Sequence, residues 1–272
     1  GAYSRWGWHH PGPLLYYLLA PLTWVFGHSG ALAGVVLINF ACAAAAVEAT
    51  RRRLGHAAAA MVVAITVVLA WALGPDLLMN PWNPRVALIP LFACGVFAWL
   101  LAGGWSKALP MVIALGSFVV QAHVGFAAVV VAIVAVAVAL WLGVERLSRQ
   151  VPSREVPSRQ VPSRQVPSRQ VPSRQIPSRQ VPSRQVMVTS AVVMLVCWFG
   201  PLVETVVHWP GNLVEIAKYF VRSDEPALGW GDAWRIFSTE VGLPGAWVRR
   251  SMLTLPLSAD SPLPALIVLG AV

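Results

Sequence analysis

The feature that most constrains this chain is a series of apolar stretches long enough to cross a lipid bilayer. A membrane-spanning helix needs about 20 mostly apolar residues. Candidates occupy residues 30–50, 57–74, 86–103 and 187–208, and another apolar run begins at residue 264. Hydrophobic residues make up 57% of the chain, charged residues only 11%, and the mean hydropathy is +0.66. These values are typical of an integral membrane protein, so we expect an all-α, multispan helical bundle.

The apolar run 109–143 needs separate treatment. As a single helix it would be about 52 Å long at 1.5 Å per residue, which is too long for one crossing. The polar stretch QAHVG at 121–125 interrupts the run near its middle. We therefore expect two short spans, 108–122 and 125–143, joined by a hairpin. The expected total is about seven spans.

The distribution of basic residues supports the hairpin, because Lys and Arg concentrate in cytoplasmic loops. Arg51–Arg53 follow the first span, Lys107 follows the third, and Arg146 follows the fifth. With the hairpin, all three positions face the cytoplasm, whereas a single span would place Lys107 and Arg146 on opposite sides. The hairpin also predicts which segments share the outer face, namely 1–29, 74–85, the turn Gln121–His123 and 209–262.

Residues 151–185 are seven near-identical copies of the pentapeptide VPSRQ. A proline in every fifth position excludes a continuous helix, so we interpret this array as an extended, disordered cytoplasmic loop. Residues 148–186 carry eight Arg and one Glu, which accounts for +7 of the net charge of +9. The basicity is therefore local and does not indicate a nucleic-acid partner. A tether for anionic lipid headgroups is the functional alternative for the array.

Three regions follow from these patterns. Residues 1–147 form membrane helices with the outer loop 1–29, residues 148–186 form the repeat, and residues 187–272 contain a helix, the outer segment 209–262 and the start of a truncated span. The apolar stretch 14–27 contains a proline and is too short to span, so we expect it to lie along the membrane interface. The three cysteines all lie in apolar runs and are interpreted as small buried side chains.

Polar residues that are able to do chemistry gather on the predicted outer face. They are His9, His10, Asp76, Asn80, Asn83, Gln121 and His123. Each has a structural alternative: the histidine pair as a headgroup anchor, the residues beside the prolines of 75–84 as turn caps, and His123 as a helix cap. Polar groups at membrane depth are costly unless they face a cavity, so their convergence on one face indicates a site. No motif of a soluble enzyme, such as a P-loop or G-x-S-x-G, is present.

Four sequence elements suggest a family. In order along the chain they are YSRWGWHHPGPLLYYLLAP, NPWNP, GSFVVQAHVG and FGPLVETVVHWPGNL. This order resembles multispan bacterial glycosyltransferases of the GT-C superfamily, related to protein mannosyltransferases and aminoarabinose transferases. The resemblance covers most of the chain except the repeat.

The resemblance implies transfer of a sugar from a polyprenyl-phosphate donor to an acceptor, which is a glycan, a lipid or a protein. The reaction would take place on the extracytoplasmic face of the bacterial cytoplasmic membrane. The acid of the family's first outer loop would lie upstream of Gly1, so we interpret the chain as a fragment. The resemblance leaves the cofactor open, a divalent metal included.

Residue roles follow from this expectation. His9, His10 and Asp76 are the candidate catalytic residues, while Arg85 and Arg5 are the candidates for binding the donor phosphate, because Arg suits bidentate phosphate contacts. The expected cavity-lining residues are Trp8, Asn80, Trp82, Asn83, Gln121 and His123. Two other functions remain open: a membrane transporter or flippase for a lipid or solute, and a non-catalytic membrane scaffold in which 209–262 docks a partner.

The predicted topology is testable by labelling single cysteines in intact cells. A cysteine at Asn83 should react with a membrane-impermeant thiol reagent from outside, and a cysteine at Ser163 should react only after the membrane is opened. The expectation rests on the Lys and Arg asymmetry of the loops. Labelling of both positions from the same side would contradict this topology.

Overall fold

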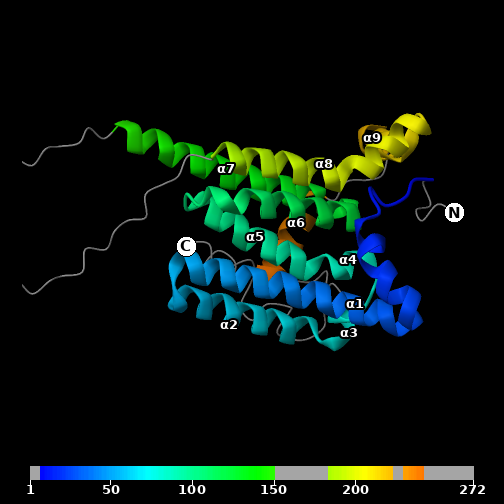
Figure 1. Cartoon of the computed structure of the whole chain (residues 1–272), viewed down its shortest axis with the longest axis horizontal. Coiled ribbons are helices and arrows are strands. Elements are labelled where there is room, and N and C mark those ends of the chain that lie inside the picture. Colours follow the sequence, from blue (N-terminus) through cyan, green and yellow to red (C-terminus); the bar gives the residue numbers. More distant parts are fainter. Residues whose placement is uncertain (1–6, 151–182, 223–228, 242–272) are drawn as a thin grey trace, which may run out of the picture.

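The computed structural model of the chain describes residues 7–150, 183–222 and 229–241, and every element there is helical (Figure 1). The α-helices are α1 (Leu14–Leu54), α2 (His56–Leu73), α3 (Pro75–Leu78), α4 (Asn83–Val86), α5 (Leu88–Ala102), α6 (Leu109–Ala122), α7 (Ala127–Gln150), α8 (Arg184–Val207), α9 (Gly211–Arg222) and α10 (Trp230–Val241). Two short 3-10 helices, η1 (Ser106–Ala108) and η2 (Val124–Phe126), precede α6 and α7.

Five stretches of the described chain are long and apolar enough to span a membrane. They are α1, α2, the stretch Asn83–Ala102, the stretch Val124–Gly143 and α8. The stretch Ser106–Ala122 is apolar but shorter. The run from residue 264, expected to be a seventh span, and repeat residues 151–182 lie outside the described residues. The described part of the chain is therefore all-helical, with several helices suited to a membrane.

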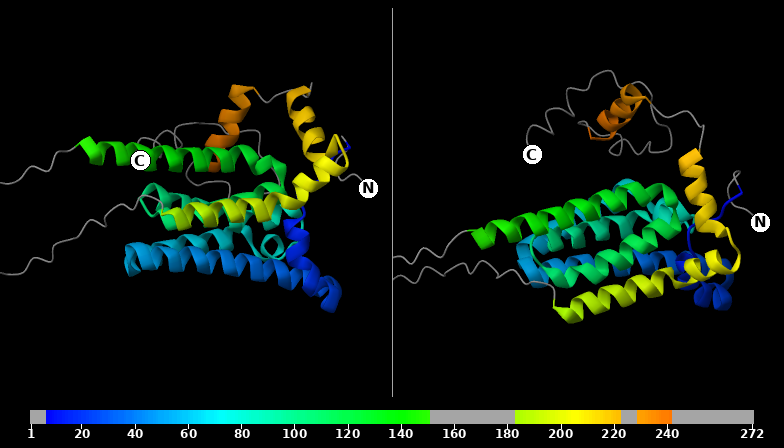
Figure 2. Two further views of the ribbon diagram at one scale, coloured as in Figure 1. Left: turned by 45° about the horizontal axis from the view of Figure 1, so that its top comes forward. Right: turned by 90° about the horizontal axis from the view of Figure 1, so that it is seen from above.

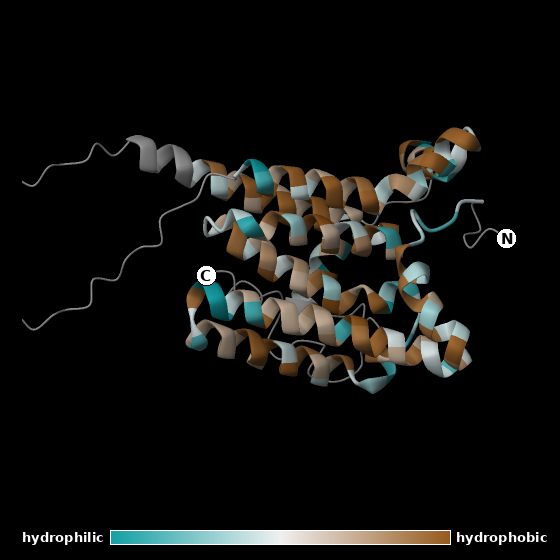
Figure 3. Cartoon of the chain, viewed as in Figure 1, coloured by the Kyte–Doolittle hydropathy of each residue, from teal (hydrophilic) through white to brown (hydrophobic). Residues whose placement is uncertain are grey.

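Helix α5 is the centre of the bundle. It packs against α1, α6 and α7, and α6 in turn packs against α8. Of the most apolar window of the α4–α5 stretch, 61% is buried, against 17% for α2 and 11% for the η2–α7 stretch. The outer helices therefore expose many apolar side chains. Figure 3 shows that hydrophobic residues, in brown, occur along much of these helices. An exposed apolar belt of this kind is what lipid contact requires.

The run 109–143 forms the expected hairpin. Helix α6 ends at Ala122, and α7 returns from Ala127 after a short turn that contains His123 and η2. The helices approach closely at Gly116, where a Cβ would lie 3.0 Å from Cγ1 of Val130 on α7. The prediction of two helices in this run is therefore confirmed.

The connections separate into two groups at opposite ends of the bundle (Figures 1 and 2). One end holds the segment before α1, the α2–α5 connection with α3 and α4, the α6–α7 turn, and α9. The other end holds the α1–α2 and α5–α6 connections, with Arg51–Arg53 in the last turn of α1 and Lys107 in η1. The sequence predicts the first group on the outer face and the second on the cytoplasmic face. The connection 74–85 differs in detail, because prolines begin two one-turn helices within it.

Helix α1 is broken at Gly27, where φ is 58° and ψ is −137°, a conformation that favours glycine. The parts before and after the break come very close together. A Cβ on Gly30 would lie 2.0 Å from the carbonyl oxygen of Leu22, and a Cβ on Gly34 would lie 2.5 Å from Cδ2 of Leu19. The first part therefore crosses the end of the bundle as a separate short helix (Figure 1).

A proline inside α8 determines how α8 is held to α6. Pro201 has no backbone N–H, so the carbonyl oxygen of Cys197 loses its donor within the helix. Gln121 of α6 is fully buried and donates from Nε2 to this oxygen at 2.7 Å. Trp198 Nε1 donates to Ser117 Oγ at 2.9 Å between the same two helices. The two bonds fix α8 against α6.

The buried amide of Gln121 also determines how the segment before α1 packs. A Cβ on Gly12 would lie 2.0 Å from Oε1 of Gln121, so only glycine allows the chain to pass at this distance. The glycine of the HHPGP element is therefore explained by contact with a residue 109 positions later in the chain. The segment 7–13, α6 and α8 form one packed unit.

Replacing Gln121 by Ala should destabilise the protein by about 1–3 kcal/mol, because the carbonyl of Cys197 is then buried without a donor. Gly12→Ala should also destabilise the wild type through its clash with Oε1, but should cost less in the Gln121→Ala background. Thermal unfolding in detergent measures both effects. Asp76→Ala, at an exposed position of the same end, is the matched control. A Gln121→Ala variant as stable as the wild type would contradict the role of this bond.

Candidate functional site: two cavities at one end of the bundle

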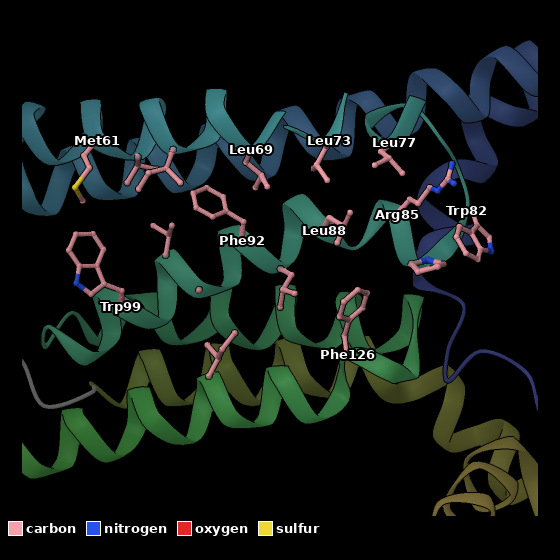
Figure 4. A pocket seen from close by; sticks show the side chains of 17 residues that line it. Met61, Leu69, Leu73, Leu77, Trp82, Arg85, Leu88, Phe92, Trp99 and Phe126 are labelled. Carbon is pink, nitrogen blue, oxygen red and sulfur yellow. The ribbon is translucent and has the colours of Figure 1, made fainter. Parts of the chain in front are cut away.

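An apolar groove runs between α2 and α5 (Figure 4). Its volume is about 860 Å³. Helix α2 packs mainly against α1, so the α2 face toward α5 is left to line the groove. The lining residues are almost all apolar: Met61, Val62, Ile65, Leu69, Leu73, Leu77, Trp82, Pro84, Arg85, Leu88, Leu91, Phe92, Gly95, Val96, Trp99, Phe126 and Ile133.

Arg85 is the one charged side chain among these lining residues, and it lies at one end of the groove (Figure 4). Its guanidinium carbon lies 5.3 Å from the centroid of the Trp82 ring, a cation–π distance. Within the described chain, no carboxylate forms a salt bridge with Arg85. Met61 and Trp99 mark the other, wholly apolar end (Figure 4). One end of the groove therefore carries a cation, whereas the rest of its wall is apolar.

A smaller apolar hollow continues this groove between α5 and α7. It has a volume of about 460 Å³ and shares Gly95, Trp99 and Ile133 with the groove. Its other walls are Ala and aliphatic side chains, such as Ala102 and Leu140. The apolar path therefore extends beyond Trp99, toward the end of the bundle that carries Lys107.

A second cavity, of about 490 Å³, lies at the same end of the bundle as Arg85 and is more polar. It lies between the segment that begins α1 and the end of α8. Its lining residues are His9, His10, Pro11, Gly12, Pro13, Tyr16, Tyr17, Gly200, Pro201, Glu204 and Asn212. Arg85 does not line it, so the histidines and Arg85 line two different cavities.

Asn212 builds one wall of the polar cavity. Its Oδ1 accepts from the backbone N–H of His9 at 2.6 Å, and its Nδ2 donates to the carbonyl oxygen of His10 at 2.9 Å. The backbone N–H of Asn212 donates to Oε2 of Glu204 at 3.1 Å. A Cβ on Gly211 would lie 2.4 Å from Cα of Thr205, so glycine is required before Asn212. The HHPGP and PGNL elements, about 200 residues apart, are thus one structural unit.

The pKa values of His10 and His123 are lowered, which favours the neutral form of each ring. Burial lowers the pKa of His10 below its ordinary value, and the neighbouring rings of His123 and His9 lower it further. Burial also lowers the pKa of His123. The ring of His10 lies against Tyr16, with centroids 6.3 Å apart. A neutral His10 is a hydrogen-bonding group and a weak counter-ion for phosphate at neutral pH.

A polar contact between the side chains of Tyr16 and Asn83 lies between the two cavities. The hydroxyl of Tyr16, which lines the polar cavity, lies 3.3 Å from Nδ2 and 3.5 Å from Oδ1 of Asn83. Asn83 is buried and directly precedes Pro84 and Arg85, which line the groove. One side-chain contact therefore connects the cationic end of the groove to the polar cavity.

Several sequence candidates have structural roles here. Oδ1 of Asn80 accepts from the backbone N–H of Trp82 at 2.9 Å, which is a turn cap. Gln121 ties α6 to α8 and lines neither cavity. His123 ends α6 and packs against Phe126, with ring centroids 5.7 Å apart. Asp76 is exposed in α3 and also lines neither cavity.

Two further candidates complete the comparison. The ring of Trp8 packs against Tyr219 of α9 at 5.7 Å, outside both linings. Arg5 lies outside the described residues. Of the expected residues, the structure therefore places Arg85 and Trp82 in the groove, His9 and His10 in the polar cavity, and Asn83 between them.

Sequence reasoning missed Glu204 and Asn212 as cavity residues. Glu204 follows Pro201 near the end of an apolar run, and Asn212 follows a Pro-Gly pair. An acid near the end of a span beside a proline was the available signal. No spacing rule shows that this acid meets residues 9–17, because the contact depends on the packing of α8 against α6.

Comparisons with protein-family models, with curated proteins and with solved structures found no match to this chain. A function for the two cavities is therefore argued from their geometry and chemistry.

Proposed function

We propose that the groove between α2 and α5 binds a polyprenyl-phosphate sugar, and that the protein takes part in transfer of that sugar at the outer face of a bacterial cytoplasmic membrane. The observation that carries the proposal is an apolar groove that ends at a single Arg85. A polyprenyl phosphate has the matching polarity, with a long hydrocarbon tail and an anionic head.

The dimensions of the groove fit a lipid tail. Its α2 wall runs from Met61 to Leu73, which is about 18 Å at 1.5 Å per residue. One leaflet of the hydrocarbon core is about 15 Å thick. The hollow past Trp99 gives the tail further apolar surface. Branched isoprene units suit walls of Leu, Ile, Val and Phe, since each buried methylene contributes about 0.8 kcal/mol.

The charge at the end of the groove selects the headgroup. Arg85 carries a permanent positive charge, and Trp82 holds its guanidinium by a cation–π contact. With no salt bridge to a carboxylate in the described part of the chain, the guanidinium keeps its capacity for a bidentate phosphate contact. The phosphate of the donor would therefore lie at Arg85, with the sugar directed out of the groove.

The orientation follows from the basic residues. The end with Arg51–Arg53 and Lys107 would face the cytoplasm, and the end with Arg85 and both cavities would face outward. In this orientation α6 is a short crossing, and the outer end of the bundle would carry the amphipathic helix α9. The donor would then be bound from the outer leaflet.

The apolar path also supports a second candidate, a transporter or flippase of lipid. The hollow past Trp99 extends the groove toward the other end of the bundle, as a path for a lipid between leaflets would require. The two functions differ in product. A transferase consumes the lipid-linked sugar, whereas a flippase returns the same lipid in the other leaflet.

Arg85→Ala should weaken binding of polyprenyl phosphate by about 1.5–3 kcal/mol, a tenfold to hundredfold loss, because a charge-assisted contact to the phosphate is removed. Binding of the lipid to the full-length protein in detergent, followed by native mass spectrometry, measures this effect. Arg53→Ala is the matched control, because it removes the same charge at the opposite end of the bundle. Equal lipid binding by Arg85→Ala and the wild type would overturn the proposal.

A further inference from the structure

We propose that the polar cavity between residues 9–17 and 200–212 binds a neutral sugar, and that Glu204 is the residue that recognises its hydroxyl groups. The inference rests on the proposed function only for how the sugar is delivered. The binding site itself is argued from the walls of the cavity.

The size of the cavity suits a small polar ligand. Its volume of about 490 Å³ lies within the range of about 300–1,000 Å³ that is usual for small-molecule sites. Its walls come from two distant parts of the chain, and three prolines stiffen them: Pro11, Pro13 and Pro201. The hydrogen bonds of Asn212 fix the backbone of the histidine pair. A preorganised cavity of this kind loses little entropy when it binds a ligand.

Glu204 provides unused hydrogen-bond acceptors. A carboxylate accepts about four hydrogen bonds through its two oxygens. Oε2 accepts the backbone N–H of Asn212, while Oε1 accepts no hydrogen bond from the part of the chain that the structure describes. The side chain is partly buried in the wall of the cavity. Hydroxyl groups of a ligand are the donors that match this carboxylate.

The aromatic residues of the cavity match the other face of a sugar. Tyr16 and Tyr17 of α1 line it, with 42% and 66% of their surface exposed. A tyrosine ring offers an apolar face to the C–H groups of a sugar and a hydroxyl at its edge. Carboxylate, imidazole and phenol groups around one cavity are therefore suited to a polyhydroxylated ring.

The charge of the cavity distinguishes a sugar from a phosphate. Among the lining residues, Glu204 is the one acidic residue and none is Lys or Arg, while burial lowers the pKa of His10 and favours its neutral form. A phosphate would therefore be repelled here and attracted to Arg85 in the groove. We therefore expect the anionic part of a ligand to bind at Arg85 in the groove and the neutral part to bind at Glu204 in the polar cavity.

The Tyr16–Asn83 contact connects the phosphate site in the groove to the polar cavity. The Tyr16 hydroxyl contacts Asn83 at 3.3 Å, and Asn83 is two residues before Arg85. This contact therefore lies between a phosphate bound at Arg85 and the polar cavity in which its sugar would bind. An acceptor sugar in the cavity would meet the donor at the same place.

Glu204→Gln is the informative variant. The side-chain oxygen of Gln still accepts the N–H of Asn212, while an NH₂ group, which is a donor, replaces the second carboxylate oxygen. The full-length protein in lipid nanodiscs should bind at least one of D-mannose, D-glucose, L-arabinose and N-acetylglucosamine in saturation-transfer NMR. Glu204→Gln should weaken that binding at least about tenfold. Glu215→Gln removes a carboxylate from α9, outside the cavity, and should bind as the wild type does.

The proposal is overturned if none of the four sugars binds to the wild type, or if Glu204→Gln binds them equally well. Its failure is distinguishable from failure of the lipid site. Polyprenyl phosphate that carries no sugar should bind to Glu204→Gln as it binds to the wild type. Loss of that binding would show that the substitution disturbs the fold and that Glu204 has no specific role toward sugar.

Discussion

The hydrogen bond from Gln121 to the carbonyl of Cys197 is the interaction on which the polar cavity depends. It exists because Pro201 leaves that carbonyl without a donor, and a buried unsatisfied carbonyl is costly in a membrane protein. The bond holds α8 against α6. The same side-chain amide lies so close to the backbone of the segment before α1 that this segment has a glycine, Gly12, at the contact. The end of α8 and the start of α1 are thereby brought together around the polar cavity.

The two cavities differ in charge and wall chemistry although they lie at the same end of the bundle. The groove between α2 and α5 is apolar and ends at a cation, whereas the other cavity has a carboxylate, imidazoles and phenols. A ligand with a hydrocarbon tail, a phosphate and a sugar has parts that match these environments in this order. The Tyr16–Asn83 contact connects the two places where the phosphate and the sugar would lie.

The sequence predicts the apolar helices, because apolar length and the interruption by QAHVG each constrain the backbone locally. Arg85 lines the groove, and its predicted contact with a phosphate stays a prediction. The grouping of side chains was not predictable. Gln121 is a polar residue of the kind found in functional sites, but here it donates a hydrogen bond to a carbonyl that the packing of α8 brings near. Glu204 is connected to the histidine pair through Asn212, which bonds to both. Such long-range contacts depend on helix packing, which no local pattern encodes.

The most direct test of the account is the location of a bound lipid tail. A polyprenyl phosphate with a photoreactive diazirine in its tail would be bound to the full-length protein, irradiated, and mapped by peptide mass spectrometry. The account predicts modification of groove residues such as Leu69 and Phe92. Modification confined to the exposed outer faces of α7 and α8, for example at Val131 and Val196, would contradict it.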